Sequence, residues 1–206
     1  MLSEDDAILE AARRTSDMLG LTGFSPTTVS WEHVTHAGMR GAKVVTPHFP
    51  VLEDAKLIIS PILQGRVEPD YWGTILAPSL IFYRRFRRSY NIGVLISFLP
   101  ALLFVLGLLV FGFLFMPHSS DAIVVVFVPG SIALVLLGAY SMLRLGLSLV
   151  LKADREAALV IGPLSLISVL RKLESLREHD ASQGHDWPEY GDHPSITKRI
   201  ANLQNP

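Results

Sequence analysis

The chain has 206 residues, of which half are apolar, and its net charge is −1. Its mean hydropathy of +0.38 is too high for an ordinary soluble domain and indicates that part of the chain lies in a membrane. With a net charge near zero, nothing in the composition suggests nucleic-acid binding. Because the chain has no cysteine, disulfides and thiol catalysis are excluded as well.

The first 90 residues predict a small cytoplasmic α+β part. Residues 3–19 have the pattern of an amphipathic helix, with Ser3 as its cap and three acidic residues in the first turn. Alternating or β-branched residues at 27–34, 42–46 and 56–60 predict short strands of a small sheet. Pro69 is placed to open a further helix, which keeps helical spacing up to the membrane.

Two apolar stretches in residues 91–150 predict a transmembrane hairpin. Residues 91–120 and 122–143 contain no charged side chain. Each stretch is long enough to cross a hydrocarbon core of about 30 Å as a helix. We predict spanning helices at about 92–115 and 122–150, joined by a short polar turn.

The charges that flank the hairpin predict its orientation. Basic residues precede the first span and lie at or after the end of the second, whereas the turn between the spans has none. Because positive charge stays on the cytoplasmic side, we expect a multi-pass plasma-membrane protein with both termini in the cytoplasm. The cluster at 84–88 is explained as a topology marker, although it could also attract anionic lipid. The flanking basic residues are Arg84, Arg85, Arg87, Arg88, Arg144, Lys152 and Arg155.

Residues 151–206 predict a cytoplasmic helical part. The second span is expected to continue as a helix until Gly162 and Pro163 end it. A second amphipathic helix is predicted at 164–178, followed by a polar, mobile surface loop at 179–192. Pro194 is expected to open a last short helix.

Three segments resemble the membrane-embedded zinc metallopeptidases of the HtpX and CAAX-prenyl-protease type. Residues 57–72 resemble the strand and helix start that precede the His-Glu-x-x-His helix of that family. Residues 151–173 are similar to its Glu-x-x-Ala-Asp helix and the following segment, and residues 192–200 to its His-Pro…Arg-Ile motif. The resemblance implies a gluzincin-like α+β domain in the cytoplasm, into which the hairpin is inserted. The residues retained from these motifs are Ala153, Asp154, His193, Pro194 and Arg199.

The metal-binding motif of that family is missing. Such a site needs two histidines one helical turn apart, a glutamate as general base and a third protein ligand from another helix. The register of the resemblance places Pro78 and Phe82 at the two histidines, Ser79 at the glutamate and Val150 at the third ligand. Pro78, Phe82 and Val150 offer no lone pair to zinc. We therefore expect no catalytic residue, no metal and no cofactor.

The resulting expectation is an inactive member of the family, a pseudopeptidase. It would lie in the lipid bilayer and bind another membrane protein or complex as a regulatory or scaffold subunit, without nucleic acid. One alternative is an active zinc metalloendopeptidase whose ligands come from His33, His36, His48 or His193. A third hypothesis is a membrane-anchored adaptor that is unrelated to peptidases.

Two further polar clusters favour structural interpretations. His33 and His36 are three apart, so on a strand they point to opposite faces. A group of metal-friendly side chains falls within the predicted loop without a recognised ligand spacing; these are His179, Asp180, His185 and Asp186. Asp154 is expected to pair with an arginine that the sequence does not identify.

Overall fold

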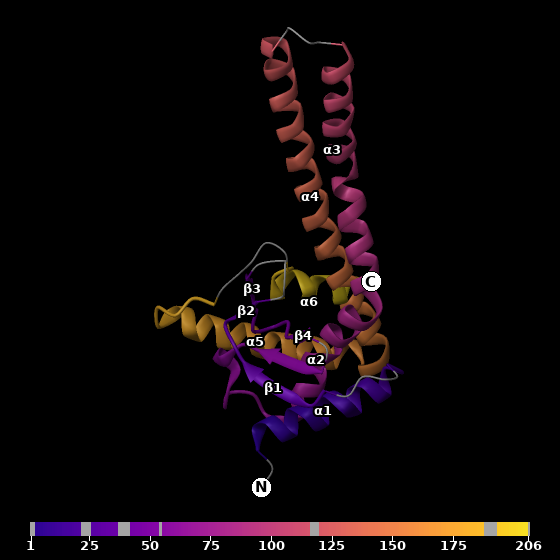
Figure 1. The fold of residues 1–206 in the computed structure, drawn as a ribbon. Coiled ribbons are helices and arrows are strands. Elements are labelled where there is room, and N and C mark those ends of the chain that lie inside the picture. Colours follow the sequence, from indigo (N-terminus) through magenta and orange to yellow (C-terminus); the bar gives the residue numbers. More distant parts are fainter. Residues whose placement is uncertain are drawn as a thin grey trace. The chain divides into compact units, whose positions relative to one another are not determined.

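A computed structural model describes residues 3–21, 26–36, 42–53, 55–115, 120–187 and 193–205; within it, the side chains of 34–36, 42–44, 111–115 and 120–128 are left aside. The chain forms two units (Figure 1). Unit 1 comprises Met1–Arg87 and Ser148–Pro206, and unit 2 comprises Arg88–Leu147. The described residues are mostly helical, with a small three-stranded sheet in unit 1.

Helix α1 (Glu4–Met18) confirms the predicted amino-terminal helix. The Ser3 hydroxyl accepts a hydrogen bond from the Asp6 backbone N–H at 3.2 Å, which satisfies one of the free donors of the first turn. The helix buries Ile8 and Ala12 and packs against α2. The two helices approach closely at Gly73, where an added Cβ would lie 2.8 Å from the Thr15 hydroxyl.

The sheet of unit 1 has the strand order β1-β5-β4. β1 (Thr28–Trp31) pairs with β5 (Lys56–Ile59) in parallel, and β4 (Val51–Glu53) pairs with β5 antiparallel. A separate antiparallel pair consists of β2 (Val34–His36) and β3 (Ala42–Val44). The predicted strand at 27–34 is therefore wrong in one respect, because the described strand ends at residue 31 and a new pairing begins at residue 34.

The helix that leads toward the apolar stretch begins as predicted. A short 3-10 turn, η2 (Pro61–Leu63), is followed by α2 (Pro69–Ile81), with Pro69 at its first position. Trp72 is fully buried on α2 and lies edge-on to the Trp31 ring, with 6.0 Å between their centroids. The chain continues through Pro78 into a π-helical turn, η3 (Phe82–Phe86), a local widening that often marks functional sites.

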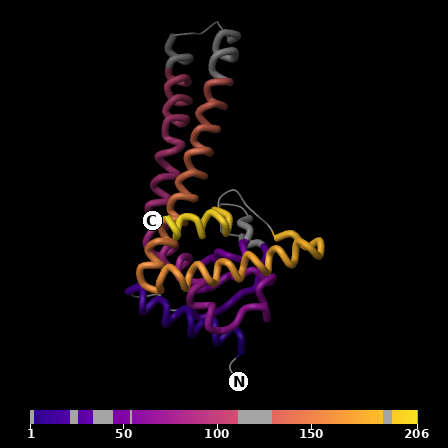
Figure 2. Tube along the Cα trace, turned by 180° about the vertical axis from the view of Figure 1, so that it is seen from behind, coloured from indigo at the N-terminus to yellow at the C-terminus, as the bar shows by residue number. Residues whose placement is uncertain are grey.

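Unit 2 consists of two long helices that lie side by side in both views (Figures 1 and 2). They belong to α3 (Arg87–Phe115) and α4 (Ser120–Ile161), which contain the two predicted spans. Of the turn predicted at 116–121, residues 116–119 lie outside the described residues, and residues 120–121 already belong to α4. Gly138 permits their contact, because an added Cβ would lie 2.8 Å from the Ser97 carbonyl oxygen.

The apolar side chains of unit 2 are exposed rather than packed in a core. Leu95 is 69% exposed, Leu109 65% and Leu136 64%. In the most apolar window of the first helix only 6% of the residues are buried, so it is not the core helix of a soluble globule. By length and composition, two helices of the described chain could cross a membrane.

The carboxy-terminal part of unit 1 is helical. α4 ends at Ile161. The next residue, Gly162, has a φ of 89°, which favours glycine, and α5 (Pro163–Ser182) starts directly after it. The loop prediction for 179–192 is wrong for residues 179–182, which lie in α5. The last helix, α6 (Ile196–Gln204), begins two residues later than predicted, since the Ser195 hydroxyl caps it. α5 and α6 pack against each other.

Candidate functional site

A tight turn at 46–49 carries two buried rings into unit 1. The Phe49 backbone N–H donates a hydrogen bond to the Thr46 carbonyl at 3.1 Å, and Pro47 occupies the second position, where its fixed φ favours such a turn. His48 is 7% exposed and Phe49 is fully buried. The turn therefore positions an imidazole and a phenyl ring beside the sheet.

Phe49 is the centre of a ring cluster that joins three separate parts of the chain. Its centroid lies 5.7 Å from the Phe82 ring, edge-on, and 5.0 Å from the His193 ring. The Tyr83 ring lies 6.4 Å away, and the guanidinium carbon of Arg199 lies 5.6 Å from the Phe49 centroid. We call these five residues the Phe49 cluster. It brings Phe82 together with the retained residues His193 and Arg199.

Arg199 forms a fully buried ion pair with Asp154. Its Nη2 lies 2.6 Å from Asp154 Oδ1 and its Nε 2.9 Å from Oδ2, in a bidentate arrangement. Its Nη1 donates a hydrogen bond to the His48 carbonyl at 2.6 Å. Both side chains are at most 1% exposed, so each buried charge depends on the other for compensation. Arg199 is thus the partner of Asp154 that the sequence left open.

The four positions that stand for the family's metal site are all buried in unit 1. Phe82 belongs to the Phe49 cluster, and Val150 is 1% exposed. The Ser79 hydroxyl is buried and makes no hydrogen bond within the described part of the chain, so nothing there activates it as a nucleophile or base. Pro78 is buried as well.

The residues present do not fit a zinc ion of the family's kind. Of the alternative ligands, His48 and His193 come close together, whereas His33 is exposed. The nearby buried carboxylate of Asp154 uses both of its oxygens for Arg199. No group of three or more His, Cys, Asp or Glu that could hold a metal occurs among the described residues. The His36 side chain lies outside them.

His48 is held in its neutral form. Burial lowers its pKa well below the ordinary value, and the nearby charge of Arg199 and then His193 lower it further, against a hydrogen bond to the Pro194 backbone that raises it. Because Pro194 has no N–H, its carbonyl accepts from the imidazole. The other nitrogen, Nε2, makes no hydrogen bond to the described residues.

This depressed pKa predicts acid sensitivity. The unfolded chain binds a proton at the ordinary pKa of about 6.5, whereas the folded chain does so only at lower pH. The stability that neutral His48 contributes is therefore fully present above that value. It is lost as the pH falls from about 6.5 toward the folded-state pKa of His48. In detergent, the melting temperature should fall between pH 7.5 and 5.5, and it should fall less in His48→Gln than in the wild type. The difference corresponds to on the order of 0.5 proton that His48 takes up on unfolding. An equal fall in the two proteins would contradict the prediction.

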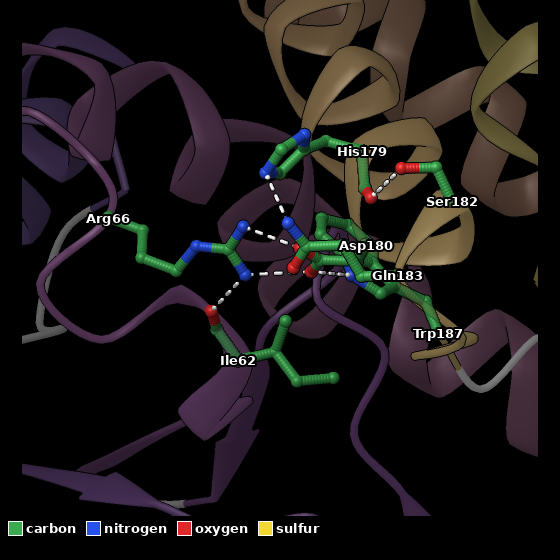
Figure 3. Close-up of polar contacts among 7 residues, drawn as sticks. All are labelled: Ile62, Arg66, His179, Asp180, Ser182, Gln183 and Trp187. Atoms are coloured by element: carbon green, nitrogen blue, oxygen red, sulfur yellow. Dashed lines mark hydrogen bonds and ion pairs between the residues drawn. The ribbon is translucent and has the colours of Figure 1, made fainter.

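A second buried charge ties the end of α5 to the segment before α2 (Figure 3). Arg66 donates to both Asp180 oxygens at 2.7 Å, and the Trp187 indole N–H donates to Oδ2 at 2.7 Å. These bonds, the arginine first, lower the pKa of Asp180 well below its ordinary range. Trp187 is buried, so this residue of the predicted surface loop is packed into unit 1, whereas residues 183–186 are exposed as predicted.

Replacing Asp180 with asparagine should loosen this connection. Loss of the charge weakens both bonds from Arg66, and we expect the free energy of unfolding to fall by about 1–3 kcal/mol. Urea unfolding in detergent, followed by Trp fluorescence, measures the change. Asp186→Asn, on an exposed neighbour, serves as the control. Equal stability of Asp180→Asn and the control would show that the pair contributes nothing.

A groove of about 500 Å³ opens on another face of unit 1. It is lined by residues of α1, by the first half of α2 and by the corner between α4 and α5. The corner exposes large apolar side chains next to the lining residues Val160 and Ile161, with Leu159 86% and Leu164 80% exposed. This groove contains Glu10, Arg14 and Asp70 but no histidine.

Comparison of the chain with family models, with curated proteins and with solved structures gave no match. The family resemblance therefore stays a prediction from the motifs. Sequence reasoning overlooked Phe49, Arg66 and Trp187. Only Phe49 carried a local signal, as an aromatic residue between Pro47 and Pro50.

Proposed function

We propose that this chain is an inactive, HtpX-like membrane protein, a pseudopeptidase that binds another membrane protein or complex as a regulatory or scaffold subunit. The observation that carries the proposal is the packing of Phe82 on Phe49. In the resemblance, Phe82 takes the place of the second zinc-binding histidine.

The chemistry of the surrounding residues supports loss of activity. A phenyl ring, a pyrrolidine ring and an isopropyl group take the three ligand places of the resemblance, at Phe82, Pro78 and Val150. The retained polar residues have structural partners instead: Asp154 and Arg199 neutralise each other, and Arg199 also holds the His48 carbonyl. These contacts stabilise unit 1 without a metal.

The membrane assignment draws support from unit 2. Its apolar side chains face outward over two helices of sufficient length, as lipid-facing side chains do. The basic residues lie at the ends of the two apolar stretches that are distant from the turn. We therefore place the protein in the plasma membrane as a multi-pass protein, with both termini in the cytoplasm.

Metal content and proteolysis test the inactive state. The protein, purified in detergent, is incubated with zinc, dialysed and analysed for bound metal, and an unfolded protein substrate is tested with and without a chelator. We expect substoichiometric zinc, equal in the wild type and in a His48→Gln, His193→Gln variant, and no chelator-sensitive cleavage. Near-stoichiometric zinc that the double variant loses would instead establish the active metallopeptidase with relocated ligands.

The absence of cysteine makes the topology directly testable. Single substitutions Ser3→Cys and Ser119→Cys are labelled in intact cells with a membrane-impermeant maleimide. We expect labelling at residue 119 from outside and at residue 3 only after permeabilisation. Labelling of residue 3 in intact cells would overturn the cytoplasmic placement of the amino terminus.

The groove at the α4–α5 corner supports the partner-binding half of the proposal. Exposed leucines beside a concave surface are typical of protein interaction sites. A photocrosslinking residue at Leu159 or Leu164 should give a defined adduct with one membrane protein, and a residue at exposed Arg171 should not. Identical adducts from both positions, or none from the corner, would count against a partner at this surface.

A further inference from the structure

Two segments that are distant in the sequence lie side by side where the chain approaches the apolar stretches. The Lys152 ammonium lies 4.9 Å from the centroid of the Phe86 ring. Nearby, Arg85 Nη1 lies 3.1 Å from Glu156 Oε2. The end of the π-helical turn η3 is thereby placed against residues 152–156 of α4.

The surface of this junction has an excess of positive charge. Arg87, Lys152 and Arg155 are exposed, and we call these three residues the junction patch. The two carboxylates of the α4 segment are already used, because Glu156 pairs with Arg85 and Asp154 is buried against Arg199. Within the described part of the chain, no carboxylate forms an ion pair with the three side chains of the patch.

We propose that the junction patch binds the headgroups of anionic phospholipids. Chain continuity places it at the membrane surface, since Arg87 precedes the apolar stretch at residue 91 by four positions and Lys152 follows the other stretch. A phosphodiester accepts several hydrogen bonds, and guanidinium and ammonium groups donate them. The patch attracts such headgroups electrostatically within about 10 Å in 0.1 M salt.

The placement of the junction-patch residues is more specific than the positive-inside signal requires. A marker needs only that basic residues stay on one side of the membrane, wherever they lie in the sequence. Here, the Lys152 ammonium lies over the Phe86 ring, and Arg87 directly follows Phe86 in the chain. Arg155 lies three residues after Lys152 on α4, and helical positions three apart share a face. Cations at these neighbouring positions attract the same headgroup region. This inference rests on the proposed membrane location of the two apolar helices, but not on the proposed pseudopeptidase function.

Lipid titration tests the proposal on the full chain. The purified protein in neutral detergent is titrated with phosphatidylglycerol, with phosphatidylcholine and with inorganic phosphate, and native mass spectrometry with thermal unfolding reports binding. We expect phosphatidylglycerol to bind roughly tenfold or more tightly than phosphatidylcholine, with a preference that declines as salt rises. Equal binding of the two lipids would overturn the proposal, as would an equal effect of inorganic phosphate, which would indicate a small-anion site.

Substitutions distinguish the effect of the junction patch on lipid binding from the effect of the protein's total positive charge. Arg87→Gln, Lys152→Gln and Arg155→Gln together should abolish most of the preference. A control removes three exposed cations elsewhere, through Arg14→Gln, Arg171→Gln and Lys198→Gln, and should keep it. A charge-preserving variant, Arg87→Lys, Lys152→Arg and Arg155→Lys, retains the topology signal and should bind phosphatidylglycerol within about threefold of the wild type. Equal losses in the patch and control variants, or loss in the charge-preserving one, would refute the proposal.

Discussion

Replacing Arg199 with alanine should destabilise the folded protein by about 3–5 kcal/mol, a large fraction of the stability of an ordinary domain. The substitution leaves the Asp154 carboxylate buried without a counter-charge and removes the hydrogen bond to the His48 carbonyl. Chemical or thermal unfolding in detergent measures the loss. In cells, the same loss should appear as a lower amount of protein in the membrane.

Two comparisons make this expectation specific to the ion pair. Lys198→Ala, on the exposed side of the same helix, should stay within about 0.5 kcal/mol of the wild type. A double variant, Asp154→Leu with Arg199→Met, removes both charges and should recover much of the stability, because apolar residues of similar size replace buried pairs well. A double variant less stable than Arg199→Ala would contradict the argument from buried charge.

Replacing Phe49 with alanine should cost about 3–5 kcal/mol in the free energy of unfolding. The phenyl ring is fully buried and contacts side chains from η3, from α6 and from the segment before α6, so its removal leaves a cavity where three parts of the chain meet. Phe49→Leu retains most of the volume and should cost less, about 1–2 kcal/mol. Denaturant unfolding of both variants gives the comparison.

A double-mutant cycle locates the effect in the Phe49 cluster. Phe49→Leu and Phe82→Leu remove an edge-on pair and should show a coupling energy of about 0.5–1.5 kcal/mol. Phe49→Leu with Ile8→Val, in the core between α1 and α2, should be additive within about 0.5 kcal/mol. Equal coupling in the two cycles would show a general loosening of unit 1 and not a specific cluster around Phe49.

The elements that depend on local chemistry could be predicted from the sequence. Ser3 caps α1, Pro69 starts α2 and Gly162 ends α4, because caps and breakers act on the backbone within a few residues. The apolar stretches predicted two long helices that could span a membrane, because a helix with apolar side chains on every face has no polar side to expose to water. Errors occur where a nearby cap or pairing competed, as at Ser195 and at residues 32–33.

The candidate site was decided by contacts that are distant along the chain. Asp154 meets Arg199 across 45 positions, Arg66 meets Asp180 across 114, and Arg199 reaches the His48 carbonyl across 151. No local pattern identifies such a partner, because a buried charge is satisfied by whichever opposite charge the packing brings to it. The sequence alone determined two apolar helices and a small α+β part. Only the tertiary structure brought Phe82, His193 and Arg199 together around Phe49.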